Sequence, residues 1–236
     1  MTKLTLDRIL QSQGFGTRKY CQSLIKDGDV AFNGVVLRKF QDKIDTDSLV
    51  LTLDGEDHVY RETVYIALNK PMDYECSRKP SHHPSILDLL PEEMTWREVQ
   101  PVGRLDHDTT GLLLLSDDGA FIHAQSSPKH HVAKRYLATT AETITPELIS
   151  ALLSGVQLID EKEPLHALEC VQVSTHQLEI VLEQGKYHQV KRMLAAAGNH
   201  CAALQRVQIG ELKLLNLDLA LGEWCYVNAD LSVDLR

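Results

Sequence analysis

Residues 103–119 read GRLDHDTTGLLLLSDDG, and this stretch joins a polar loop to four consecutive leucines. A short apolar run that ends in a turn signal is typical of a strand buried on both faces. A loop directly before such a rigid strand can hold a carboxylate in a fixed position, as catalysis requires. We therefore select Asp106 as the leading catalytic candidate. The alternative is that Asp106 only caps a turn through side-chain hydrogen bonds.

The length and composition predict a soluble protein with one large domain and a small appendage. The chain has 236 residues, of which 43% are hydrophobic and 24% charged. No apolar stretch approaches the roughly 20 residues of a spanning helix, and the N-terminus MTKLTLDRIL lacks the apolar region of a secretory signal. The five cysteines include no CxxC pair, which suits free thiols in a reducing compartment. We expect a cytoplasmic location and no membrane partner.

The net charge of −9 argues only weakly against nucleic acid as a partner. Salt screens charges beyond about 10 Å, so a local basic face can bind phosphates while acidic residues elsewhere dominate the sum. The distribution of charge along the chain is therefore more informative than its total.

The first 55 residues predict a compact helical module followed by a hairpin. Leu6, Ile9 and Leu10 have helical spacing before Gly14, and a second helix is expected between the N-cap candidate Thr17 and residue 28. The dipeptide Asn-Gly at 33–34, between two apolar runs, predicts a hairpin with a type I′ turn.

The second helix carries a basic face formed by Arg18, Lys19 and Lys26. Such a face is often only solvated. However, the stretch GTRKYCQSLIKDGDVAFNG at residues 16–34 resembles the alpha-L RNA-binding module first known from a small-subunit ribosomal protein. The resemblance implies that residues 1–55 form an RNA-binding domain and that these three cations contact RNA.

The charge-rich segment 56–62 is expected to be a linker, and residues 63–236 a larger domain. Strands are predicted around TVYIALNKP (63–71), GLLLLS, KRYLATT (134–140), LHALECVQV (165–173) and HQLEIVLEQ (176–184), with helices after Thr145-Pro146 and at HQVKRMLAAAG (188–198). Because strands often follow one another without a helix between them, the fold class is α+β with a mixed, mostly antiparallel sheet.

Three blocks of this larger domain together resemble the pseudouridine synthases. The stretch at 103–119 resembles their catalytic signature, which reads GRLD, two variable residues, TTG, an apolar run and DG. The KRYL stretch at 134–137 and GKYHQVKRML at 185–194 resemble two further blocks of that family in type and order. With the N-terminal module, the whole chain is similar to the ribosomal small subunit pseudouridine synthase A type.

The resemblance implies a role for each matching residue. Asp106 corresponds to the nucleophilic aspartate, Tyr136 to the aromatic residue against the target uracil, and Lys191 to the basic partner of the aspartate. Arg104 corresponds to the arginine that helps hold the flipped nucleotide. The implied reaction converts uridine to its carbon-linked isomer without a cofactor, and Asp106 could add to the anomeric carbon or abstract a ribose proton.

These blocks also concentrate basic residues, which predicts a local phosphate-binding face. We expect Lys134 and Arg192 to bind RNA there, as members of a set that comprises Lys129, Lys134, Arg135, Lys186, Lys191, Arg192 and Arg206.

Other chemistries are weaker readings. The pairs His82-His83 and His130-His131 point apart in extended chain and show no metal-ligand spacing, so no metal site is expected. Asp106 and Asp108 lie too close in a tight loop to face each other across a sugar as in a glycoside hydrolase. The sequence has no phosphate-binding GxxxxGK loop and no nucleophile elbow.

The predicted function is therefore isomerisation of one uridine in small-subunit ribosomal RNA, with a partly assembled small subunit as partner and a monomeric enzyme. Two alternatives remain at this point: a pseudouridine synthase that acts on large-subunit RNA, and a non-catalytic RNA-binding factor in ribosome assembly.

Overall fold

The computed structural model describes residues 3–127 and 130–234, and the chain divides into two compact units. The first unit comprises the described residues up to Val64 together with Leu90–Val99, and the second comprises Tyr65–Leu89 and Gln100–Asp234. Within the described residues, no helix has both the length and the apolar character that crossing a bilayer requires.

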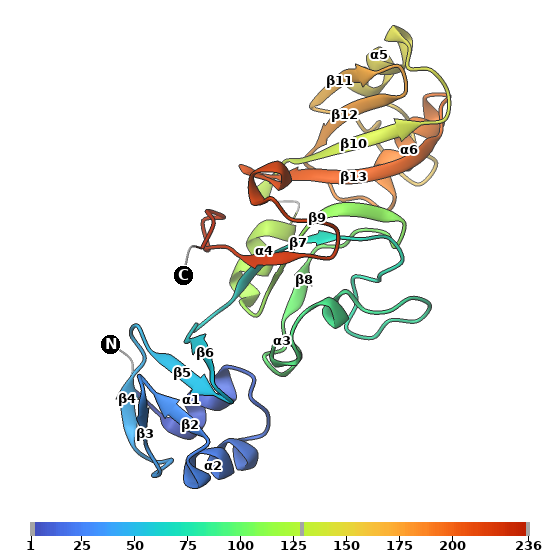
Figure 1. Ribbon diagram of the computed structural model, residues 1–236. Helices are drawn as coiled ribbons and strands as arrows, with labels where there is room; N and C mark the ends of the chain where they lie inside the picture. Colours follow the sequence, from blue (N-terminus) through green and yellow to red (C-terminus); the bar gives the residue numbers. More distant parts are fainter. Residues whose placement is uncertain (1–2, 128–129, 235–236) are drawn as a thin grey trace. The chain divides into compact units, whose positions relative to one another are not determined.

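The first unit packs short strands and helices around one apolar core (Figure 1). Its elements are β1 (Lys3–Thr5), α1 (Leu6–Ser12), α2 (Arg18–Asp27), β2 (Val30–Phe32), β3 (Val35–Val36), β4 (Lys43–Asp45), β5 (Val50–Leu53), β6 (Glu56–Val59) and α3 (Glu92–Trp96). The predicted N-cap and hairpin turn are both confirmed. The Thr17 side chain accepts a hydrogen bond from the Tyr20 amide at the start of α2, and Asn33 and Gly34 both have positive φ in the β2–β3 turn.

Residues 56–62 are not simply the linker that their composition predicts. They begin with β6, which pairs with β5 in a four-stranded sheet of order β3-β2-β5-β6. The turn between the two strands is Asp54-Gly55, in which both residues have positive φ, so this dipeptide forms a second hairpin turn. The segment is charged because β6 is an edge strand, where charged side chains hinder pairing with other chains.

The second unit contains a nine-stranded mixed sheet, which confirms the α+β class. Its elements are β7 (Tyr65–Lys70), η1 (Ile86–Leu89), β8 (Gln100–Val102), β9 (Thr109–Ser116), α4 (Gly119–Ser126), β10 (Lys134–Thr140), α5 (Pro146–Ser154), β11 (Glu169–Ser174), β12 (Gln177–Leu182), α6 (Gln189–Ala196), β13 (Cys201–Ile209), β14 (Leu212–Lys213), η3 (Leu214–Leu217) and β15 (Trp224–Tyr226). The main path runs β11-β12-β10-β13-β9-β7-β15, with β8 on β9 and β14 on β13. Among these described pairings only β9 with β13 is parallel, so the sheet is mostly antiparallel.

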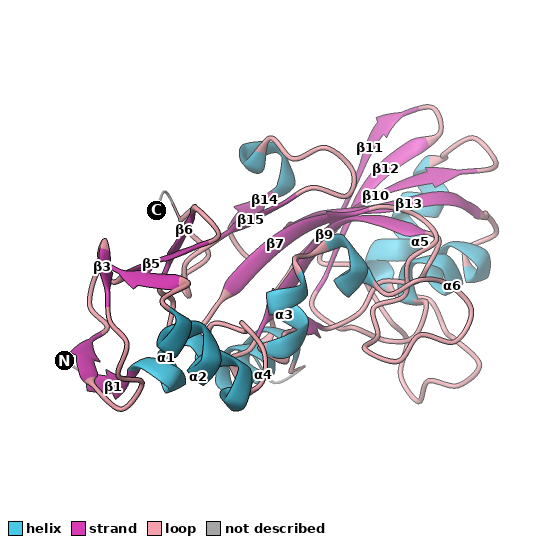
Figure 2. Ribbon diagram, turned by 60° about the horizontal axis from the view of Figure 1, so that its bottom comes forward, coloured by secondary structure: helices cyan, strands magenta, loops and turns pink. Residues whose placement is uncertain are grey.

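Helices α5 and α6 lie on the same side of this sheet (Figure 2). Leu148 and Leu152 of α5 and Met193 and Leu194 of α6 pack with buried residues of β10, β12 and β13 in one core cluster. From this position α6 directs Lys191 toward the loop before β9, where the candidate aspartate lies.

The parallel junction of β9 and β13 depends on a glycine. Gly111 lies opposite Arg206 with φ +100°, and a Cβ there would come within 2.3 Å of the Arg206 carbonyl oxygen. Only glycine fits both the backbone conformation and the close approach. This is the glycine of the TTG motif.

Candidate active site

A buried lysine fixes the loop before β9 through hydrogen bonds to its backbone. Lys70 is 0% exposed, and its Nζ donates hydrogen bonds to the carbonyl oxygens of Pro71, His107 and Thr109 at 2.9, 3.1 and 3.0 Å. Two of these carbonyls, those of His107 and Thr109, lie one and three positions after Asp106 in the chain. Burial lowers the pKa of Lys70 below its usual value, although the neighbouring Cys76, Asp108 and Asp106 oppose this shift. The loop therefore has little freedom to move the Asp106 carboxylate.

Asp106 lies between two basic groups of the segment that carries α6. Lys191 Nζ is 3.0 Å from Asp106 Oδ2 and 2.6 Å from Asp108 Oδ1, while His188 Nε2 is 3.1 Å from Asp106 Oδ1. The Asp106 side chain is 27% exposed. The structure thus brings together Asp106 and Lys191, as predicted, and adds His188, which precedes Lys191 by three residues in the same sequence block.

The electrostatics of this cluster favour charged side chains. Burial alone would lower the pKa of Lys191, but hydrogen bonds and charge from Asp108 and Asp106 raise it above its usual value. Burial alone would raise the pKa of Asp108, but Lys191 holds it below the usual value. At neutral pH Lys191 is therefore a cation beside the candidate nucleophile.

A cavity of about 180 Å³ opens beside Asp106. Tyr136 of β10 pairs directly with Arg206 of β13, and Leu204 of β13 pairs with Thr109 of β9, so these side chains form neighbouring parts of one wall. The remaining lining is contributed by Val102, Gly103, Arg104, Leu105, Gln125, Ser126, Lys134, Leu182, Glu183, Gln184, Gly185, Lys186, His188, Gln189 and Val190. Arg104 and Tyr136 therefore line the same cavity as Asp106.

Several buried polar atoms in this wall have no hydrogen-bond partner. Of the five such side-chain atoms found in the described parts of the chain, three belong to residues that line the cavity: Thr109 Oγ1, Gln125 Oε1 and Arg206 Nη2. Buried polar groups are nearly always paired in folded proteins. The cavity is therefore built for a polar ligand that supplies the missing partners.

Two of the cations predicted to bind phosphate lie elsewhere than expected. Arg206 is only 4% exposed, and its Nε donates to the Leu112 carbonyl oxygen at 2.7 Å, so it is a cavity residue and not a surface residue. Arg135 bonds Glu169 at 2.6 Å and Glu179 at 3.1 Å and lines a different cavity with Gln205. Arg135 faces away from Tyr136 because adjacent strand residues face opposite sides of a sheet, whereas the burial of Arg206 depends on strand pairing, which the sequence alone does not show.

The other members of the basic set are partly engaged within the protein. Lys134 lines the cavity, and burial, together with the charge of Arg206, lowers its pKa to about 8. Arg192 contacts Asp160 at 3.3 Å, and Lys186 contacts Glu161 at 2.9 Å. Lys129 lies outside the described residues.

In the first unit the predicted basic face of α2 is confirmed as exposed, but one member is paired. Arg18 Nε lies 2.8 Å from the carboxylate of Asp7, which is 1% exposed and also accepts hydrogen bonds from Gln22 and Thr5. Lys19 is exposed, and the ammonium of Lys26 lies 5.0 Å from the centroid of the Phe40 ring. Lys19 and Lys26 are thus the more available cations.

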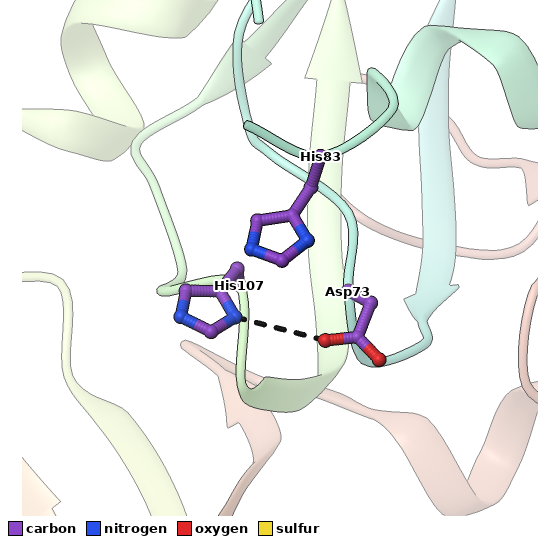
Figure 3. A group of neighbouring side chains, drawn as sticks. All are labelled: Asp73, His83 and His107. Carbon is purple, nitrogen blue, oxygen red and sulfur yellow. Dashed lines mark ion pairs between the residues drawn. The ribbon is translucent and has the colours of Figure 1, made fainter. Parts of the chain in front are cut away.

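The structure also places Asp73, His83 and His107 together, which the sequence did not indicate (Figure 3). One ligand atom of each lies within 4.8 Å of the others, and His107 Nδ1 is 3.8 Å from Asp73 Oδ1. The two imidazoles, however, are stacked with ring centroids 4.4 Å apart and planes only 16° apart. Lone pairs in nearly parallel planes do not converge on one ion, so this arrangement would need a ring rotation to bind a metal.

A larger cavity of about 870 Å³ contains none of the predicted catalytic residues. It is lined by Arg135, Glu179, Gln205 and Val207, which alternate along their strands with the residues of the Asp106 cavity. It therefore lies on the other face of the sheet, away from Asp106.

Comparison with known proteins supports one family for this constellation. The family model for RNA pseudouridylate synthase matches residues 64–196. An uncharacterized RNA pseudouridine synthase of Bacillus subtilis (strain 168), YtzG, is 36% identical over 225 residues, which cover 94% of this chain and 93% of that protein. The ribosomal small subunit pseudouridine synthase A of Escherichia coli (strain K12) is 41% identical over 160 residues, or 68% of each chain.

A solved structure agrees with this assignment along the whole chain. A crystal structure of a pseudouridylate synthase superposes with a TM-score of 0.67 at 32% sequence identity and covers 96% of this chain and 97% of its own. The matched residues include the loop of Asp106, the strand of Tyr136 and the start of α6. This chain therefore belongs to the RNA pseudouridylate synthase family and isomerises uridine in RNA to pseudouridine.

Proposed function

We propose that this enzyme modifies one uridine of small-subunit ribosomal RNA. The ribosomal small subunit pseudouridine synthase A proteins of Escherichia coli and of Vibrio parahaemolyticus are 41% and 35% identical to it, the latter over 96% of this chain. We further propose that the substrate is RNA in a partly assembled subunit, and that the enzyme acts as a monomer in the cytoplasm.

Within this reaction we assign the central role to Asp106. The observation that carries this assignment is the position of its carboxylate at the wall of a cavity, 3.0 Å from Lys191 and 3.1 Å from His188. The ionised carboxylate is the form able to attack or deprotonate the ribose, and the Lys191 ammonium lies within hydrogen-bond distance of it. The target nucleotide must leave its stack to reach this position, at a cost of a few kcal/mol.

Tyr136 and Arg104 complete the binding of the flipped nucleotide in this proposal. Tyr136 offers a ring on which uracil stacks, which returns about 1–3 kcal/mol of the cost of flipping. Arg104 is exposed at the edge of the same cavity, where a guanidinium can hold the phosphate beside the flipped base. Lys134 and Arg192 extend the contact with RNA from neighbouring positions.

For the first unit we propose RNA anchoring by the exposed face of α2. Lys19 and Lys26 are free of carboxylate partners among the described residues, whereas Arg18 shares its charge with Asp7. Each phosphate contact adds to the salt dependence of binding. A Lys19→Ala/Lys26→Ala enzyme should therefore bind ribosomal RNA more weakly and with a flatter dependence on salt than the wild type. An unchanged salt dependence would refute this role.

The catalytic assignment is tested by replacing Asp106 with Asn. The Asp106→Asn enzyme should bind RNA but form no pseudouridine, measured as tritium release from RNA that contains [5-³H]uridine. Asp108→Asn is the matched control, because Asp108 contacts the same Lys191 but does not line the cavity. Equal losses in both variants would contradict the special role of Asp106.

The ribosomal target is tested by mapping pseudouridines in cells with and without the gene. One position in small-subunit RNA should lose its pseudouridine when the gene is deleted. Loss at a position in large-subunit RNA instead would reject the proposed target but keep the activity.

A further inference from the structure

A buried arginine in the wall of the Asp106 cavity has a guanidinium group that is only partly hydrogen-bonded. Arg206 is 4% exposed, its Nε bonds the Leu112 carbonyl oxygen at 2.7 Å, and its Nη2 has no partner. No ion pair with Arg206 is formed within residues 3–127 and 130–234. Burying a cation without a carboxylate is unfavourable for folding. A charge retained under these conditions indicates a ligand that complements it.

Arg97 shows what a purely structural buried arginine looks like in the same chain. It is 9% exposed, and its Nη1 and Nη2 donate to the carbonyl oxygens of Arg61 and Glu62 at 3.0 and 3.2 Å. Its guanidinium ties backbone segments of the first unit together. Arg206 lacks this second set of contacts, so its Nη2 remains unpaired in the wall of the cavity.

The strand register directs Arg206 toward the place proposed for uracil. Arg206 pairs with Tyr136 of β10 on one side and with Gly111 of β9 on the other. Both Arg206 and Tyr136 line the Asp106 cavity. Thr109 lies on the same face as Gly111, two residues earlier, and its Oγ1 is also buried and unpartnered. The residues with unpaired groups thus line the same cavity as the tyrosine.

The reaction creates a negative charge on the detached base, and this charge can serve as the missing partner of Arg206. When uridine is isomerised, the bond between ribose C1′ and uracil N1 breaks, and its electron pair remains on the base. The detached uracil is then an anion, with charge shared by N1 and the two carbonyl oxygens. A new bond forms between C5 and C1′, the proton on C5 is lost, and N1 gains a proton. No oxidant, reductant or other reactant is consumed.

We propose that Arg206 is a catalytic residue whose Nη2 donates a hydrogen bond to a uracil carbonyl oxygen as negative charge develops on the detached base. Gln125 Oε1, the third unpartnered atom of the cavity wall, accepts the N3–H of uracil, and Thr109 Oγ1 donates to the second carbonyl oxygen. This donor and acceptor set complements uracil and not cytosine, which carries an acceptor at N3. The inference rests on the proposed binding of uracil against Tyr136.

Preorganised donors aimed at developing charge act mainly on the rate of the chemical step. Removing one such donor typically lowers kcat by about 100-fold to 1000-fold. We therefore expect Arg206→Ala to lower kcat by about 100-fold or more and to change KM by less than about threefold. The measurement is single-turnover and steady-state tritium release from [5-³H]uridine RNA.

Chemical rescue separates this role from a structural one. Guanidinium chloride at a non-denaturing concentration should restore part of kcat to Arg206→Ala, because the cation can occupy the space that the side chain leaves. Urea, which is planar and similar in size but neutral, should not restore kcat. Arg97→Ala is the matched control: it should melt at a lower temperature than the wild type but retain kcat, and guanidinium should not raise its activity.

Thr109→Val provides a second test, because this substitution keeps the size of the side chain and leaves no large void in the protein. Replacing an unpartnered buried hydroxyl by a methyl group should leave the melting temperature unchanged or higher. The same change should lower kcat/KM by about 10-fold if the hydroxyl bonds uracil in the transition state. A structural hydroxyl would instead lower the melting temperature without this kinetic effect.

The outcomes are distinguishable. The inference would be overturned if folded Arg206→Ala kept kcat, and folded Thr109→Val kept kcat/KM, within about threefold of the wild type. Rescue of Arg206→Ala by urea as well as guanidinium would also overturn it, since charge would then be irrelevant. If Arg206→Ala does not fold, Arg206→Lys should fold and show the kcat loss, because its shorter cation cannot reproduce both hydrogen bonds. A wild-type enzyme that modifies large-subunit but not small-subunit RNA would reject the proposed target and leave this test unaffected.

Discussion

Replacing Lys70 with Met should both destabilise the second unit and impair catalysis. The side chains have similar volume, but methionine cannot donate to the carbonyl oxygens of residues 71, 107 and 109, which accept bonds of 2.9, 3.1 and 3.0 Å from Lys70. A buried acceptor left without a partner costs about 1–3 kcal/mol. Removing the ammonium also removes the cost of burying it, which offsets part of that loss. We therefore expect the free energy of unfolding to fall by about 1 kcal/mol for each of the three acceptors, or about 3 kcal/mol in total.

The catalytic effect should appear separately from the loss of stability. Two of the three carbonyls belong to the loop directly after Asp106, so its carboxylate should lose its fixed position, and a displacement of about 1 Å can cost about 100-fold in rate. Urea unfolding followed by circular dichroism gives the change in stability, and tritium release well below the melting temperature gives the change in kcat. Lys162→Met, at an exposed position of the same unit, is the control and should match the wild type in both. A Lys70→Met enzyme with wild-type stability and kcat would refute the proposed function of this lysine.

Three further predictions concern the first unit, the strand junction and the cavity. The pKa of Asp7 is lowered from 3.8 to about 2, because hydrogen bonds from Thr5, Gln22 and Arg18 outweigh the effect of burial. The ionised Asp7 therefore contributes about 2 kcal/mol to stability above pH 4, and this contribution is lost as the pH falls toward 2. The difference in unfolding free energy between the wild type and Asp7→Asn should shrink over that range in acid unfolding. A constant difference would contradict this prediction. Gly111→Ala should lower the melting temperature and abolish activity, because its Cβ would lie 2.3 Å from the Arg206 carbonyl oxygen; a variant with wild-type stability would show that β13 can shift. Tyr136→Leu should lower kcat/KM by about 5-fold to 150-fold through lost stacking, measured by tritium release, and a smaller effect would argue against stacking.

The amino-acid sequence by itself determined the local structure and the principal catalytic candidate. The N-cap at Thr17, the Asn33-Gly34 turn and the apolar run of β9 depend on interactions between near neighbours in the chain, so their patterns could be interpreted directly. The composition of segment 56–62 does not distinguish a linker from an exposed edge strand, because both are rich in charged residues.

Only the tertiary structure decided which distant residues meet at the site. The parallel pairing of β9 with β13 places Arg206 opposite Gly111, although 95 positions separate them in the chain. The same folding buries Lys70 beneath the Asp106 loop, brings His188 to the Asp106 carboxylate, and turns Arg135 away from it. Charge and spacing in the sequence do not reveal these roles, because burial and hydrogen-bond partners arise only when the strands are paired and the helices are packed against them.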